Sequence, residues 1–90
     1  MSACVKLPPY FQDLAGGDKV VDVKSRTVSE MIDELNRKYP GIKEHLLDRK
    51  GRLQGYVEIF INDDVVYPES TSMPVRDGDE IEIQMIVSGG

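Results

Sequence analysis

The stretch Glu80-Ile81-Glu82-Ile83-Gln84-Met85-Ile86-Val87 runs directly into Ser88-Gly89-Gly90, the last residues of the sequence. Polar and apolar side chains largely alternate along it, which is typical of a β-strand with one buried and one exposed face. Glycine has no Cβ, so a Gly-Gly end can adopt positive φ and enter a narrow channel. The stretch therefore predicts a strand over residues 80–87 that presents the carboxylate of Gly90. The alternative is a tail without a role.

Length and composition exclude several classes of protein. The sequence has 90 residues, and Lys+Arg 11 against Asp+Glu 16 gives a net charge of −5. We expect a single domain over residues 1–90 with a tail at 88–90. The acidic balance argues against nucleic-acid binding, which favours a basic surface. We also expect no membrane span, because no apolar run approaches about 18 residues. A single cysteine, Cys4, and an N-terminus without a long apolar stretch indicate a cytoplasmic protein.

The first half of the sequence predicts a hairpin followed by a helix. Residues 3–7 and 19–24 form the two strands, joined by a connector over residues 8–17. Thr27-Val28-Ser29-Glu30 matches a capping box, in which the Thr and Glu side chains each satisfy an orphan N–H group. An apolar stripe at helical spacing follows, and Pro40-Gly41 ends the helix. Glu34 and Lys38, four residues apart, suggest an exposed pair. Residues 42–48 are expected to add one helical turn.

The second half predicts two or three further strands. Residues 56–62 alternate, with Val57, Ile59 and Ile61 inward, and residues 65–67 form an edge strand. The turns are Asn62-Asp63-Asp64 and Asp77-Gly78-Asp79. A single capped helix with one apolar stripe must then cover one face of a small mixed sheet. The fold class is α+β: a four- to five-stranded sheet with one main helix across one face and the other face open to water.

No set of residues in the sequence has the pattern of a catalytic or metal site. His45 is the one histidine, and we expect it to be a solvated side chain. Cys4 lacks a basic partner and is expected to pack as a small apolar residue. Asp63-Asp64 and Asp77-Gly78-Asp79 lack the twelve-residue loop of a calcium site, so they indicate turns. We predict that the chain is not an enzyme and holds no metal.

Binding is better supported than catalysis. The strand alternation exposes Phe60 beside Glu58 and Ile86 beside Gln84, and Pro8 continues the outer face of the first strand. Exposed Phe and Ile side chains near the chain end predict a docking patch for a partner. The alternative is that these are scattered surface apolar residues, which are common in any protein.

The order of these motifs resembles a known family. The segments are Ile59-Phe60-Ile61-Asn62-Asp63, Asp77-Gly78-Asp79-Glu80-Ile81 and Val87-Ser88-Gly89-Gly90. In this order, with the last at the end of the chain, they resemble the ubiquitin-like β-grasp sulfur carriers. That family includes the small subunit of molybdopterin synthase, the carrier of thiamine biosynthesis and the carrier of a cysteine-biosynthesis route. The resemblance covers essentially the whole chain.

The resemblance implies a specific chemistry at Gly90. An activating enzyme, similar to the ubiquitin-activating adenylyltransferases, would use ATP to adenylate the Gly90 carboxylate. A sulfur donor would then replace AMP and leave a thiocarboxylate, which passes sulfur to an acceptor enzyme or synthase subunit. Gly89 would keep the stalk narrow, and Ser88, with Phe60, Ile86 and Pro8, would contribute to partner docking. The carrier itself would hold no cofactor.

The sequence leaves the pathway and two other functions open. Gln84, Met85 and Ile86 stand where molybdopterin-synthase subunits commonly carry an aromatic residue and a proline pair. Residues 40–55 form a longer region than in typical thiamine carriers. The cysteine-type carrier and a molybdopterin-type paralogue fit best. The alternatives are a ubiquitin-like modifier joined to target lysines through Gly90, and a module that binds partners without covalent attachment.

Overall fold

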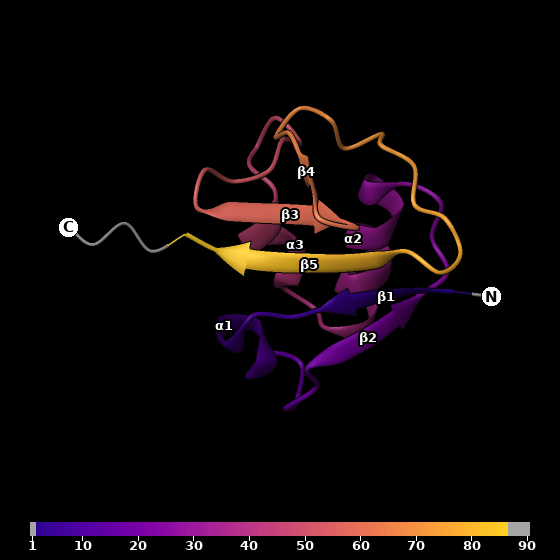
Figure 1. Ribbon diagram of the computed structural model, residues 1–90. Coiled ribbons are helices and arrows are strands. Elements are labelled where there is room, and N and C mark those ends of the chain that lie inside the picture. The colour runs from indigo at the N-terminus through magenta and orange to yellow at the C-terminus, as the bar shows by residue number, and fades with distance from the viewer. Residues whose placement is uncertain (1, 87–90) are drawn as a thin grey trace.

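A five-stranded mixed sheet, in the order β2-β1-β5-β3-β4, is covered on one face by helices (Figure 1). The computed structural model describes residues 2–86. The strands are β1 (Ala3–Lys6), β2 (Val20–Val23), β3 (Val57–Ile61), β4 (Asp64–Val66) and β5 (Glu80–Met85). The helices are α1 (Pro9–Gln12), α2 (Val28–Lys38) and α3 (Ile42–Leu46). The α+β class and the mixed sheet are therefore confirmed.

The central strand of the sheet is β5, the last one in the sequence. It pairs in parallel with β1, with Val5 opposite Ile81, and antiparallel with β3, with Ile59 opposite Ile83. All four of these side chains are buried beneath the helices. The strands β2 and β4 form the two edges, each joined by a hairpin to its neighbour. The last described residues, Met85 and Ile86, therefore lie at the middle of the sheet.

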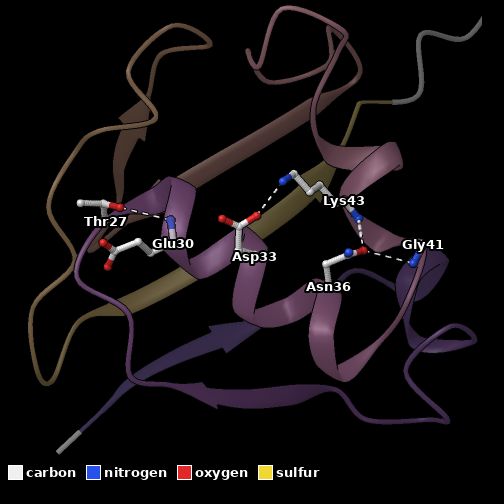
Figure 2. Close-up of polar contacts among 6 residues, drawn as sticks. All are labelled: Thr27, Glu30, Asp33, Asn36, Gly41 and Lys43. Carbon is white, nitrogen blue, oxygen red and sulfur yellow. Dashed lines mark hydrogen bonds and ion pairs between the residues drawn. The ribbon is translucent and has the colours of Figure 1, made fainter.

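Helix α2 begins as the sequence predicts and packs its apolar stripe on the sheet. The Thr27 hydroxyl accepts a hydrogen bond from Glu30 N at 3.1 Å (Figure 2). The Glu30 carboxylate accepts a hydrogen bond from Arg26 N. The capping box predicted Thr27 N, the next residue, as the donor. The apolar stripe is buried and comprises Val28, Met31, Ile32 and Leu35.

Helix α3 is held against α2 by polar contacts as well as by its buried residues, Ile42 and Leu46. The Asn36 side-chain oxygen accepts from Gly41 N and from Lys43 N, each at 3.1 Å (Figure 2). These two N–H groups lie at the start of α3, where helical geometry leaves donors without partners. Lys43 Nζ also forms an ion pair with Asp33 at 2.7 Å. Asn36 therefore sets the turn between the two helices.

The connector expected over residues 8–17 is wrong in part, because it contains α1. Pro9 stands at the first helical position, where its fixed φ suits the helix and its missing N–H costs nothing. Phe11, on this short helix, is fully buried in the core. Four residues are too few to give a periodic pattern in the sequence. The helix is recognised only in the structure, where Phe11 packs into the core. None of the helices within residues 2–86 has the length and apolar character that a membrane span requires.

The expected exposed pair of Glu34 and Lys38 is wrong in part: the two side chains form no ion pair within residues 2–86, although the charge of Lys38 acts on Glu34. The Glu34 carboxylate accepts from Lys24 N at 2.9 Å and from the Ser25 hydroxyl at 2.6 Å. Lys38 Nζ instead donates to the Asp22 carbonyl at 3.1 Å. Burial alone would raise the pKa of Glu34, but these two hydrogen bonds and the nearby lysine and arginine charges outweigh it. The pKa of Glu34 is consequently lowered from its ordinary 4.5.

Truncation of the α2 stripe tests the core. We expect Leu35→Ala to lower the free energy of unfolding by about 2–5 kcal/mol, because a buried aliphatic side chain is lost and a cavity remains. The exposed Tyr67→Ala is the matched control and should change it by less than about 0.5 kcal/mol. Urea denaturation measures both values, and equal effects in the two variants would contradict the assigned core.

Replacement of Glu34 tests the link between β2 and α2. A carboxyl group whose pKa is lowered by folding stabilises the protein above its ordinary pKa, and this contribution is lost as pH falls through the folded value. We therefore expect wild type to be more stable than Glu34→Gln at pH 7, with the difference shrinking below about pH 4.5. Urea titrations at several pH values measure it. Glu69→Gln, on an exposed loop, serves as the control, and a difference that persisted unchanged at pH 3 would refute the assignment.

Candidate functional site

The residues expected to carry the chemistry lie outside the described part of the chain. They are Gly90 and Gly89, together with Ser88 and Val87. The description ends at Ile86, one residue beyond β5. The structure therefore defines the platform that precedes these residues, and the side chains of that platform form the candidate site.

Within residues 2–86, no helix covers the sheet face opposite α2 and α3 (Figure 1). The strand register arranges the outward side chains of this face in rows across the strands. Phe60 lies opposite Val65 on one side and Glu82 on the other. Glu82 lies opposite Lys6, which in turn lies opposite Val20. The row thus crosses all five strands. Phe60, expected to be exposed, is half-buried within it.

The predicted patch of Phe60 and Ile86 is not one patch. Ile86 lies beside Tyr56, whose carbonyl accepts from Ile86 N at 2.8 Å. Phe60 is level with Glu82, four residues before Ile86, which corresponds to about 13 Å along a strand. The pair of Glu58 and Gln84 lies between the two positions. Two separate apolar spots result, and the one beside the chain end consists of Tyr56 and Ile86, both exposed.

Sequence reasoning placed Tyr56 on the outer face but did not assign it to the site. The strand alternation identifies its face, whereas its partner on β5 depends on the register between β3 and β5. That register, with Val57 opposite Met85, brings Tyr56 level with Ile86. A pairing rule based on residue type alone does not provide it.

The placement of Pro8 on the exposed outer face is wrong, because Pro8 is buried. Its carbonyl accepts from Phe11 N at 2.9 Å and from Gln12 N at 3.2 Å, so it caps the start of α1. A shallow groove nevertheless runs between Pro8-Pro9 and the last residues of β5. Lys6, Leu7, Gln84 and Met85 also line it. Pro8 shapes this groove and does not project from it.

The charges on the open face are predominantly negative. Asp22, Glu58, Glu80 and Glu82 point outward from β2, β3 and β5, while Lys6 is the one basic residue among the outward side chains of the described strands. Their inward neighbours are buried, which fixes this orientation. A partner with basic groups around an apolar centre would complement such a face.

The two candidate reactive side chains have structural surroundings. The His45 ring lies edge-on to Tyr10, with centroids 5.6 Å apart, and 5.9 Å from Phe11. His45 is half-buried, so the expectation of a solvated side chain is wrong and it packs α3 against α1. Cys4 is half-buried and lies level with Asp22 and Glu80. No basic side chain stands level with it, so the register supplies no group that would activate it as a nucleophile.

The acidic turns are held by hydrogen bonds, as turn chemistry predicts. Asn62 donates to Asp79 Oδ1 at 2.9 Å and accepts from Glu80 N, while Asp79 Oδ2 accepts from Arg76 N. Asn62 and Asp63 both have positive φ, at 49° and 72°, as a tight hairpin turn requires. Within residues 2–86, no group of three His, Cys, Asp or Glu residues could hold a metal ion.

Comparison with known proteins agrees with this architecture. A family model described as the ThiS family matches residues 5–90. The chain belongs to the ThiS family. The sulfur carrier protein CysO of Mycobacterium tuberculosis is 33% identical to this ThiS-family chain over 93 aligned residues, covering 100% of both proteins.

Solved structures place the ThiS-family chain among ubiquitin-like β-grasp proteins. A chain of the Amycolatopsis orientalis BexX/CysO complex is 31% identical, with a TM-score of 0.88 over 98% of this chain and 99% of that one. Small archaeal modifier protein 1 of Methanosarcina acetivorans is 29% identical, with a TM-score of 0.80 over 99% and 96%. The predicted β-grasp fold and the prediction of a sulfur carrier, not an enzyme, are confirmed.

The open face beside the chain end can be tested by substitution. We expect Ile86→Glu to weaken binding of an activating enzyme at least about tenfold, because it places a charge in the apolar spot and adds to the negative face. Phe60→Ala should weaken binding less, since Phe60 is half-buried and farther from the chain end. Isothermal titration calorimetry measures the affinities. Val20→Ala, at the opposite edge, is the control, and an equal loss in all three variants would refute the site.

Proposed function

We propose that the Gly90 carboxylate is the sulfur-carrying group and that an ATP-dependent adenylyltransferase activates it. The observation that carries the proposal is the position of β5: it is the central strand of the sheet, and Gly89-Gly90 follow its last residue, Met85, closely in the sequence. The CysO relatives, named as sulfur carriers and matched over their whole length, support it. In this proposal the chain holds no cofactor, and its partner binds the ATP.

The proposed chemistry requires no acid or base from the carrier. A carboxylate oxygen of Gly90 attacks the α-phosphorus of ATP, pyrophosphate leaves, and an acyl-adenylate forms. The terminal sulfur of a persulfide then attacks the acyl carbon and AMP leaves, which gives an acyl disulfide. A second thiol reduces this disulfide, releasing the thiocarboxylate and forming a disulfide with the donor. The thiocarboxylate sulfur is the nucleophile that an acceptor enzyme uses.

The short distance between the folded domain and Gly90 limits which enzymes can act on Gly90. Residues 87–90 span at most about 14 Å when fully extended. An enzyme acting on Gly90 must therefore contact the domain close to Ile86. The exposed Tyr56 and Ile86 side chains and the negatively charged side chains of the open face are available for this contact.

The sequence left two types of carrier open, and the cysteine type is the better supported of the two. The Mycobacterium tuberculosis protein named CysO matches the whole chain in sequence, and its crystal structure covers 94% of the chain. We infer that the acceptor of the sulfur is an enzyme of cysteine biosynthesis. A molybdopterin-type acceptor remains the second candidate.

Covalent attachment to other proteins is the alternative function, and the similarity to a small archaeal modifier protein favours it. The same acyl-adenylate could be attacked by a lysine amine, giving an isopeptide bond and releasing AMP. Digests of cell extract would then contain lysines that bear the C-terminal remnant of this chain. Their absence would remove this alternative.

Mass spectrometry of the intact protein tests the proposed carrier function. After incubation with an activating enzyme, ATP and a sulfur source, we expect the mass to increase by the difference between sulfur and oxygen. A variant lacking Gly89 and Gly90 is the control and should show no increase. If the truncated chain nevertheless supports growth in a strain that needs the gene, Gly90 is not the reactive group and a non-covalent role is indicated.

A further inference from the structure

The central strand is paired unequally on its two sides. On the β3 side, the register of β5 continues to Met85, opposite Val57. On the β1 side it ends at Glu82, opposite Lys6. The last part of β5, from Ile83 onward, therefore has a neighbouring strand on one side only.

Pro8 is the physical reason for this early end. Parallel pairing of β1 with β5 begins with Cys4 N donating to Asp79 O at 3.0 Å and advances in steps of two residues. Its next step after Lys6 would require the N–H of residue 8 to donate to the Ile83 carbonyl. Proline has no N–H group, so the ladder stops there.

The backbone groups that this leaves without a partner point toward β1. Asn62 N donates to Glu80 O and Ile86 N donates to Tyr56 O, so the even-numbered residues of β5 bond to β3. The intervening residues, Ile83 and Met85, direct their N–H and C=O groups to the other side. Within residues 2–86, no backbone group there pairs with the Ile83 carbonyl or the Met85 N–H. They form a short half-edge, defined here as Ile83 to Met85.

The half-edge borders open space. The groove described above lies along it, with Leu7, Pro8 and Pro9 on the β1 side and Gln84 and Met85 on the β5 side. Figure 1 shows β1 turning away into α1 at this point while β5 continues. An extended peptide presents alternating donors and acceptors at the same spacing as a strand, so it can pair with this half-edge.

We propose that the half-edge binds an extended segment of the activating enzyme by main-chain hydrogen bonds, as a short strand that takes the place β1 vacates. This rests on the proposed function, because an enzyme acting on Gly90 must lie within about 14 Å of Ile86. The half-edge ends one residue before Ile86, so it lies within the distance that such an enzyme must approach. Pairing there would hold the exit of the chain straight and fix its direction into the active site.

Two variants at one position separate main-chain from side-chain binding. Met85→Pro removes the N–H of the half-edge without removing a bond to β3, whereas Met85→Ala keeps the N–H. With the enzyme that loads the chain in the mass-spectrometric assay, and without ATP, we expect Met85→Pro to raise Kd about tenfold over Met85→Ala. Equal Kd values for the two variants, with thermal unfolding showing both folded, would overturn the proposal while leaving the carrier function intact.

Amide hydrogen exchange of the unaltered protein provides a measurement that needs no variant. In the isolated protein, Met85 N–H should exchange at least about tenfold faster than Gln84 N–H, which faces β3. Addition of the enzyme should slow Met85 to the rate of Gln84. Slow exchange at Met85 before addition, or no slowing after it, would overturn the proposal. Slowing that depends on the carrier concentration alone would also overturn it, because a second copy would then occupy the half-edge.

Discussion

The pairing of β5 between β1 and β3 is the interaction on which the rest of the structure depends. It joins the N-terminal hairpin to the second hairpin, and its buried Ile81 and Ile83 complete the inner face on which α2 packs. The β1–β5 contacts link segments near the two ends of the sequence, so their formation requires closure of a long loop. The same pairing places Met85, the last residue of β5, in the middle of the sheet.

The two faces of the sheet consequently differ in role: one packs the core and the other is open to a partner. The inner face and the helices supply the buried apolar core. Asn36 links α2 to α3, and Glu34 links α2 to the segment that follows β2. The open face contributes little to that core, so its side chains can vary with the needs of a partner. A carrier whose reactive group is its own terminal carboxylate needs no catalytic side chains, and the described residues show a platform built on that principle.

Pro8 has a structural role that the sequence alone does not show. In the sequence it marks the end of a strand and the start of a connector, and its outward placement was wrong. In the structure it caps α1 with its carbonyl and ends the β1–β5 ladder by lacking an N–H. Both effects follow from the chemistry of proline, but the second concerns Ile83, which lies far away in the sequence.

The sequence by itself determined the features that depend on neighbouring residues. The strand alternation, the Thr27 cap of α2 and the turn at Asp77-Gly78-Asp79 are local, and they were predicted correctly. The turn predicted at Asn62-Asp63-Asp64 was correct for its first two residues, whereas Asp64 begins β4. The short helix α1, the partners of Glu34 and the stacking of His45 require contacts between distant segments, and they were missed. Only the tertiary structure decided which outward side chains stand side by side, because strand register depends on pairing across the sheet. That register separates Phe60 from Ile86 and brings Tyr56 to the chain end.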